Sequence, residues 1–579
     1  MISLSRIKER KLVQWALAYL AGAWLVLQVL DLMVDNFGWP AGIFRIASTV
    51  LAIGLLAALV IAWYHGEKGA QRVTGMEIGM LAGILVLAAV GVALLRGGAD
   101  GATGDSAATV AGIEAAAPAA AEQGSIAVLP FADMSEGSDQ EYFSDGLTEE
   151  LLNVLARIPE LRVAARTSSF AFKGKQIPVD SIGRALHVAH VLEGSVRTAG
   201  DMVRITAQLV NAETGYHLWS ETYTREMKDI FAVQDSISRA IVAELELRLA
   251  NDSELAQKET DDPEAHRLLL RAAHNVTSVR TRASIAEAAQ LAEQAIERDP
   301  DYARAYAILA AAQQYQAYRK WLEPEPTYDA SRRNAQRALE LNPELAEAHV
   351  TLGQIADNHD WKFKEAEAHF RSAVKINPSN AGAHSTRAWL LMRLGRTNEA
   401  LSAARRAVDL DRLSASSRNA LASMQVYAGD APGSIATYRE ALELVDSTAS
   451  GVIQSNLALS YSETGQHEEA MRIAREAAET LGEDAFGLGT IGIVYARAKR
   501  RAEAEAALRR LEKLDGTEYF RASVYHVLGD RDRALSLLEE AVGNHDDSVV
   551  DLGLDPTFAG LHGDPRFKAL LRKIGLPSA

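Results

Sequence analysis

The chain has 579 residues, more than one hydrophobic core supports, so several structural units are expected. It carries 60 Lys and Arg against 76 Asp and Glu, a net charge of −16, which argues against a general nucleic-acid binder because such proteins need a basic surface. The absence of cysteine excludes disulfides, thiolate metal sites and cysteine nucleophiles.

Three long apolar runs open the chain, at about 12–34, 46–64 and 76–95. Each has about the 20 residues that a helix needs to cross a bilayer. Six Lys and Arg lie before the first run and between the second and third, whereas the opposite side has only Arg45 and Arg96. The positive-inside rule then predicts a membrane domain of three transmembrane helices over 1–96, with the N-terminus in the cytoplasm and the residues after about 96 outside it.

A linker and a small α/β unit are predicted next. Residues 97–123 are rich in Ala and Gly without periodicity, which is typical of a flexible tether. Apolar alternation then predicts strands, and apolar residues at helical spacing predict helices, the first capped by Ser144 or Asp145. The expected strands are 125–131, 161–166, 190–197, 202–212 and 217–225, and the expected helices are 143–158, 179–189 and 229–249.

Several of these segments, in order, resemble the TolB-like N-terminal domain of bacterial membrane proteins. They include SIAVLPF from Ser125, FSDGLTEELLNVLARI from Phe143, VLEGSVR from Val191 and VRITAQLVNAETGYHLWSETY from Val203. The resemblance covers 124–251 and implies a compact α/β domain that binds or assembles, without established chemistry. It also implies a bacterial inner membrane, which makes the expected location of the residues after about 96 the periplasm.

Two groups of charged residues in this unit are candidates for chemistry. The carboxylates Asp145, Glu149 and Glu150 lie near the expected start of a helix, where acidic side chains favour the helix dipole in any protein. We therefore interpret them as helix-start residues and not as catalytic groups. A basic patch is the second candidate, and a solvated face is the favoured interpretation of it; its residues are Arg166, Lys173, Lys175 and Arg184.

A repeat fills the rest of the chain. Two ladders of small residues recur about every 34 positions, and turn glycines at Gly395, Gly429, Gly465 and Gly529 form a third, with Lys499 in the same place in one unit. Antiparallel helices approach closely only where the facing side chains are small, so these ladders predict paired helices. The first ladder is Gly353, Ala388, Ala422, Ala458, Gly492 and Ala522, and the second is Ala366, Ala400, Ser434, Ala470, Ala504 and Ala534.

These spacings resemble the tetratricopeptide repeat, and imply an all-α solenoid of about eight units over 262–543. The expected units are 263–299, 303–341, 346–376, 381–410, 415–444, 451–481, 485–514 and 516–543, the second with an insertion at 321–327. Residues 544–579 resemble the closing segment of such solenoids and are expected to cap the last helix pair. The resemblance implies a concave groove for a protein or peptide partner.

Other motifs do not support cofactor, metal or catalytic sites. Gly487, Gly489 and Gly492 match G-x-G-x-x-G, but the string falls in a predicted helix and not in the strand–turn–helix unit that a dinucleotide site needs. His349 and His384 occupy equivalent places in consecutive repeats and are expected to face each other in packing, because no third ligand has fixed spacing.

The sequence therefore predicts a membrane-anchored, extracytoplasmic protein-binding scaffold or sensor, without catalytic residues or cofactors. Its expected partners are a protein or peptide in the groove, the lipid bilayer through three helices and a further membrane protein, with no nucleic acid. Two alternatives stay open. One is a regulatory module for a separately encoded cyclase, kinase or transcription factor; the other is an enzyme with an unfamiliar site in the α/β unit.

Overall fold

The computed structural model describes residues 124–135, 141–158, 160–199, 202–226, 229–245, 259–279, 281–445 and 450–577. The predicted transmembrane runs and the linker lie outside these residues. Among the residues that the structure describes, no helix has the length and apolar character needed to span a bilayer. Contacts divide the chain into two units, Met1–Ala115 and Ala116–Ala579, and the features below belong to the second.

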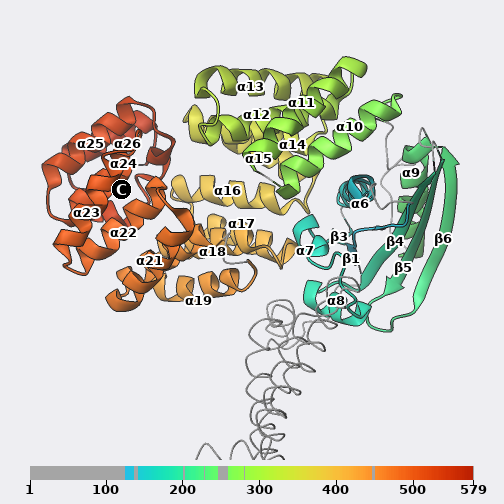
Figure 1. Ribbon diagram of the computed structural model, residues 1–579, viewed down its shortest axis with the longest axis horizontal. Helices are drawn as coiled ribbons and strands as arrows, with labels where there is room; N and C mark the ends of the chain where they lie inside the picture. The colour runs from blue at the N-terminus through green and yellow to red at the C-terminus, as the bar shows by residue number, and fades with distance from the viewer. Residues whose placement is uncertain are drawn as a thin grey trace, which may run out of the picture. The chain divides into compact units, whose positions relative to one another are not determined.

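The α/β unit contains one mixed sheet in the order β3-β1-β4-β5-β6, and β2 pairs with β4 off this path. β1 runs parallel to β3 and to β4, whereas β4, β5 and β6 form an antiparallel meander (Figure 1). The three strands of the meander are long, and β5 alternates between buried and more exposed side chains, whereas β6 is mostly exposed. The bounds are β1 (Ser125–Val128), β2 (Ala132–Asp133), β3 (Arg162–Val163), β4 (His190–Ala199), β5 (Met202–Asn211) and β6 (His217–Glu226).

Helices α6 (Glu141–Leu155) and α9 (Ile230–Glu244) pack on the apolar face of this sheet. Leu147, Leu151 and Leu155 of α6 are fully buried there with strand residues such as Ile205. Two short helices, α7 (Arg166–Phe170) and α8 (Val179–Leu186), follow β3. All the predicted strands and helices of this unit are present, while β2 and α7 were not predicted.

Two predicted boundaries in this unit are wrong. Helix α6 begins at Glu141, so Ser144 and Asp145 lie inside it and do not cap it. The strand predicted over 161–166 is reduced to two residues, because the chain leaves the sheet after Ala164. The amide of Ala165 donates to the carbonyl of Leu410, 2.9 Å away in the helical region, and α7 begins at the next residue.

The rest of the described chain is built from antiparallel helix pairs that follow the predicted repeat units (Figure 1). We call the helices of each pair the first and the second helix. The pairs are α10 (Pro263–His274) and α11 (Arg282–Arg298); α12 (Ala303–Tyr318) and α13 (Pro324–Leu341); α14 (Ala346–Gln354) and α15 (Phe363–Ile376); α16 (Ala381–Arg393) and α17 (Thr397–Leu410); α18 (Ala415–Tyr427) and α19 (Ala431–Leu442); α20 (Gly451–Glu463) and α21 (His467–Leu481); α22 (Ala485–Arg497) and α23 (Arg501–Leu511); and α24 (Glu518–Val527) and α25 (Arg531–Gly543).

The small-residue ladders lie at the buried contacts of these pairs. Gly353 in α14 faces Phe370 in α15, and a Cβ at this glycine would lie 2.5 Å from the Phe370 ring. Gly492 in α22 likewise leaves room for Val524 of the next first helix, 2.6 Å from an added Cβ. The ladder residues are buried throughout, namely Gly353, Ala366, Ala388, Ala400, Ala422, Ser434, Ala458, Ala470, Gly492, Ala504, Ala522 and Ala534.

The third pair departs from the regular repeat. Ala366 lies 13 positions after Gly353, whereas Ala400 lies 12 positions after Ala388. A π-helical turn, η3 (Ile355–His359), follows α14 and absorbs the extra residue. A similar π-turn, η2 (Asn275–Val279), follows α10. Neither turn was predicted, because the ladders fix the contacts between helices and not how the chain between them is wound.

The turn between the two helices of a pair requires a left-handed backbone. Gly395, Gly429, Gly465 and Gly529 have φ between 73° and 91° at this place, and Lys499 has φ 60°. A side chain in this region is strained, whereas glycine is not.

Lys499→Gly is therefore expected to stabilise the seventh pair, by about 1 kcal/mol, because it removes left-handed strain from an exposed residue. The measurement is the midpoint of thermal unfolding followed by circular dichroism. Gly465→Lys is the matched control at the same place in the preceding pair and is expected to lower the midpoint. A lower midpoint for Lys499→Gly would contradict the assignment of this turn.

The chain ends in two 3-10 turns and a helix, η4 (Asp547–Asp551), η5 (Pro556–Leu561) and α26 (Pro565–Ile574). Helix α26 packs on α25, and Phe567, Leu571 and Ile574 are buried there. This is the cap position expected for the closing segment. Residues 545–561 reach further, to Trp361 before α15, to Arg393 of α16 and to Tyr519 of α24, which was not predicted.

Candidate functional site

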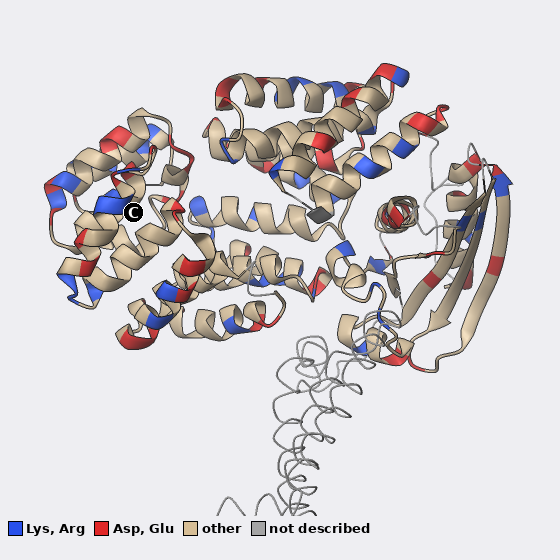
Figure 2. Ribbon diagram, viewed as in Figure 1, with Lys and Arg blue, Asp and Glu red and all other residues tan. Residues whose placement is uncertain are grey.

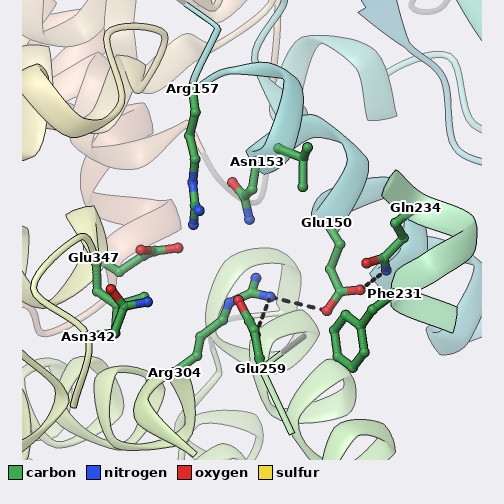
Figure 3. A pocket seen from close by; sticks show the side chains of 11 residues that line it. Glu150, Asn153, Arg157, Phe231, Gln234, Glu259, Arg304, Asn342 and Glu347 are labelled. Carbon is green, nitrogen blue, oxygen red and sulfur yellow. Dashed lines mark hydrogen bonds and ion pairs between the residues drawn. The ribbon is translucent and has the colours of Figure 1, made fainter. Parts of the chain in front are cut away.

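The α/β unit joins the solenoid through charged residues that face α10 and α12. Glu150 of α6 accepts hydrogen bonds from Gln234 of α9 and from Arg304 of α12, the latter with Nη1 3.2 Å from Oε1 (Figure 3). Glu259 lies near the same nitrogen of the guanidinium, with Oε2 3.7 Å from Nη1. His266 of α10 places Nε2 3.6 Å from Glu150 Oε2. We call Glu150, Gln234, Glu259, His266 and Arg304 the junction cluster.

The junction cluster has two carboxylates for one buried guanidinium. Burial raises the pKa of Glu150 to about 7, against the opposing effect of Arg304, and also raises the pKa of Glu259. Burial lowers the pKa of His266 to about 4, so the imidazole is neutral at pH 7 and does not supply a second positive charge. Both carboxyl groups therefore hold a proton more readily than an exposed glutamate does.

A cavity of about 40 Å³ lies at the junction cluster, lined also by Asn153, Arg157 and Glu347 (Figure 3). It is far below the several hundred Å³ of a typical pocket for an organic ligand. A cavity of about 270 Å³ adjoins it beside Asn342. The geometry at Glu150 therefore fits a polar contact between the α/β unit and the solenoid, in which the ion pair between Glu150 and Arg304 links the two.

The other two carboxylates that were singled out also face the junction. Asp145 is 1% exposed and lies 2.6 Å from Lys173 Nζ, with His274 of α10 3.6 Å away. Glu149 is 7% exposed and accepts from Arg166 Nε at 2.5 Å. The interpretation of Asp145, Glu149 and Glu150 as helix-start residues is wrong, because α6 begins earlier and turns them toward its neighbours. The sequence analysis also missed Arg304. The signal that could have indicated its role is the presence of a charged residue among the alanines of α12.

The four basic residues for which a solvated face was the favoured interpretation do not form one patch, and three of them bind separate carboxylates. Arg166 and Lys173 bind the buried carboxylates described above, and Arg184 binds Asp180 one turn earlier in α8, at 2.8 Å. Lys175 is exposed on the turn after α7. Figure 2 shows basic and acidic residues mixed along the helices of the solenoid as well.

A second contact joins α7 to the fourth and fifth pairs. Ser168 is buried; its amide and hydroxyl both donate to Asp411 Oδ1, at 3.1 and 2.6 Å, and its hydroxyl accepts from the amide of Leu413. Asp411 follows α17 and is 5% exposed. The α/β unit therefore contacts the solenoid at its first two pairs and again at the fourth and fifth.

Glu150→Gln tests the protonation of the junction cluster. The native pKa of about 7 lies above the unfolded value near 4.5, so this group stabilises the fold below pH 4.5 and its contribution is lost as the pH rises to 7. The variant lacks this loss. The difference in the free energy of unfolding, variant minus wild type, is therefore expected to be about 2–3 kcal/mol larger at pH 8 than at pH 5.

Urea unfolding at the two pH values measures this difference, and Glu340→Gln on the exposed face of α13 is the control, with an unchanged difference between pH 5 and pH 8. An equal effect of Glu150→Gln at both pH values would show that Glu150 is charged in the native state throughout this range.

The first helices of the solenoid pack directly on one another, as α16 does on α18 and α22 on both α20 and α24. We call the surface formed by α14, α16, α18, α20, α22 and α24 the inner face. It is the surface that a curved helical solenoid offers to a partner. Small buried side chains allow this close stacking, as Gly489 of α22 shows, where an added Cβ would lie 3.0 Å from Phe520 of α24.

The residues of two other motifs have packing roles in the structure. Gly487, Gly489 and Gly492 all lie within α22, so the G-x-G-x-x-G string has no strand–turn–helix frame.

The expectation that His349 faces His384 is wrong: His349 Nδ1 lies 3.0 Å from Nδ1 of His369, and His384 Nε2 lies 3.1 Å from the carbonyl of Pro378. His369 sits on the second helix of the same pair, a contact that equivalence between repeats does not predict. The described residues contain no group of three or more His, Asp or Glu side chains placed to hold a metal ion.

Comparison with known proteins identifies the helical part. Residues 327–381, 362–424 and 452–487 match families described as tetratricopeptide repeat. A protein of Rhizobium meliloti (strain 1021) with the provisional name adenylate cyclase 3 is 38% identical over 246 residues. That stretch is 42% of this chain and 42% of the relative, so the chain spans less than half of the relative's length.

Similar solved structures include yeast Tom70, MamA and Pseudomonas aeruginosa pilF. Tom70 is 18% identical, with 56% of this chain and 69% of that chain covered and a TM-score of 0.34. MamA is 21% identical over 30% of this chain and 92% of that chain, with a TM-score of 0.25, and pilF is 18% identical over 39% and 96%, with a TM-score of 0.31. The family matches and the helix pairs together show that the helical part of this chain contains tetratricopeptide repeats, and a small α/β unit precedes them.

Proposed function

We propose that this protein is a scaffold that binds a protein or peptide partner on the inner face of its solenoid. The observation that carries the proposal is the continuous stacking of first helices from α16 to α24, which presents side chains of successive repeats to one ligand. The α/β unit supports this role because the junction cluster and the bond between Ser168 and Asp411 fix it to the solenoid.

Site-specific crosslinking in intact cells tests the scaffold. A photoreactive residue replaces Val452, which is 46% exposed on α20, and crosslinked proteins are identified by mass spectrometry. A probe at Glu479, exposed on the second helix α21, is the matched control. A defined partner crosslinked at Val452 and not at Glu479 is expected. Equal and nonspecific labelling at both positions would contradict a partner on the inner face.

We further propose that the apolar runs at 12–34, 46–64 and 76–95 anchor the protein in a bacterial inner membrane, with the solenoid in the periplasm. The support is the length of the runs and the asymmetry of Lys and Arg around them. A reporter that is active only outside the cytoplasm is expected to be active when it is fused after Ala579. Activity of a cytoplasm-specific reporter at this position would overturn the orientation.

A regulatory role toward a nucleotide cyclase is the second candidate, favoured by similarity to the Rhizobium meliloti protein. In this case the chain is expected to change the output of a separately encoded adenylate cyclase. Cyclic AMP is measured in cells that express the cyclase with and without this chain, and also with the purified chain alone. Turnover by the purified chain would favour an enzyme instead, and no effect in either assay would remove the cyclase link.

A further inference from the structure

Strand β6 is the long edge of the sheet in the α/β unit. It has ten residues and pairs with β5 on one side, and no other described strand pairs with its second side (Figure 1). Eight of its ten residues are exposed. An edge strand presents a row of backbone N–H and C=O groups that can pair with another chain. The opposite edge, β3, has only two residues, so β6 is the edge that can accept a long partner strand.

The sequence of β6 lacks the features that protect edge strands from pairing. Natural edges are protected by proline, by lysine, by bulges or by a short length. β6 contains neither proline nor lysine. The register shift between Leu209 and Val210 of β5 lies near the start of β6, and the pairing is regular from Trp219 to Glu226. Residues 219–226 therefore have the extended geometry that a second strand requires.

Two opposite charges on this edge have no ion pair. Glu221 and Arg225 lie on the same face of β6 as Tyr223, because side chains alternate along a strand, and both are exposed. Glu221 accepts from the Tyr223 hydroxyl at 2.9 Å, and Arg225 Nη1 donates to the carbonyl of Thr224 at 2.9 Å. Neither forms an ion pair with a residue that the structure describes. A carboxylate and a guanidinium thus stand four positions apart on the open edge.

A second copy of β6 that runs antiparallel supplies the matching charges. In a two-fold symmetric pair, each contact between two residues occurs twice. When the two copies of Tyr223 lie opposite each other, Glu221 of each copy lies opposite Arg225 of the other, which gives two ion pairs. Thr222 lies opposite Thr224 in the same register, and threonine pairs across strands are favourable. A shift of two residues in either direction removes both ion pairs.

We propose that β6 is an interface for a second copy of this chain, in which the two strands pair antiparallel about Tyr223 and join the two sheets into one. The backbone groups of the edge supply the affinity, and the pairs between Glu221 and Arg225 set the register. The dimer carries two solenoids and offers a ligand two copies of the inner face. This interface is separate from the proposed scaffold function, and each can fail without the other.

Charge reversal in the full chain tests the interface. Two copies with different affinity tags are expressed in one cell and extracted in a mild detergent. One tag is captured, and the amount of the other copy that co-purifies is measured. Wild-type copies are expected to co-purify. Glu221→Arg in both copies places like charges opposite each other, as does Arg225→Glu in both copies, so each is expected to lower the recovery about tenfold.

The mixed pair keeps the test independent of how well each variant folds. With Glu221→Arg in one copy and Arg225→Glu in the other, each arginine again lies opposite a glutamate, so the recovery is expected to return to the wild-type level. Arg197→Glu is the matched control, because Arg197 is exposed on β4 away from the edge, and is expected to leave the recovery unchanged. Equal recovery in every combination, or no recovery with wild-type copies, would overturn the interface.

The absence of cysteine from the chain permits a second, geometric measurement. In the proposed register Thr222 of one copy lies opposite Thr224 of the other. A chain with both Thr222→Cys and Thr224→Cys is therefore expected to form a disulfide-linked dimer under mild oxidation. Arg197→Cys with Ala199→Cys places two exposed cysteines at the same spacing on β4 and is expected to stay monomeric. An equal yield of linked dimer from both chains would contradict pairing through β6.

Discussion

Arg304→Leu is expected to destabilise the joint between the α/β unit and the solenoid by about 3–5 kcal/mol. Arg304 is buried and forms ion pairs with both Glu150 and Glu259, while Arg157 lines the same cavity. Without it, the two buried carboxylates lose the guanidinium that forms ion pairs with both of them, and the desolvation of at least one is no longer offset. Thermal unfolding measures the loss, and hydrogen exchange in α6, α9 and α12 locates it.

Arg271→Leu is the matched control for this substitution. Arg271 lies on α10, in the same part of the solenoid, but its side chain is 56% exposed and its partner Glu287 is exposed as well. Exposed ion pairs contribute little, so the melting temperature is expected to stay nearly unchanged. Adding Glu150→Gln and Glu259→Gln to Arg304→Leu is expected to restore much of the lost stability. A cost that persists in the triple variant would show that Arg304 acts through packing and not through charge.

The solenoid was predictable because its main constraint is local and periodic. Close contact between two helices leaves no room for a large side chain, so Gly353, Ala400 and Ala470 mark the contact in the sequence itself. The turns are equally local, since the left-handed residue after each first helix favours glycine. Lys499 shows the strength of the pattern: it occupies the turn position predicted from its neighbours and has their backbone conformation.

The junction cluster could not be predicted, because its residues are distant in the sequence and have no shared period. Glu150 and Arg304 are separated by 154 positions, and each alone resembles an ordinary charged residue on an amphipathic helix. Residues 545–561 were assigned only as part of a cap for a similar reason. Their aspartates resemble turn residues in the sequence, and only the fold brings Asp551 to Arg393 and Asp555 to Tyr519.

Ala470→Arg is expected to have the largest effect in the solenoid, a loss of several kcal/mol. Ala470 is fully buried on α21 and belongs to a core with Tyr461 of the facing helix α20 and Tyr438 of the preceding pair. An arginine at this place both overfills the contact and buries a charge without a partner, and each effect alone is destabilising. Chemical denaturation and circular dichroism measure the loss; Glu479→Arg, exposed two turns later on the same helix, is expected to change little.

The loss should also be local at first. In a solenoid each pair contacts mainly its neighbours, so a disrupted contact in the sixth pair weakens the fifth and seventh before the rest. Hydrogen exchange is therefore expected to rise first in α18 through α23, while α10 and α12 at the junction cluster keep their protection. An unchanged melting curve would refute the assignment of Ala470 to the helix contact. A uniform rise in exchange from α10 to α25 would instead show that the contacts of residues 545–561, which link distant pairs, make the whole solenoid unfold as one unit.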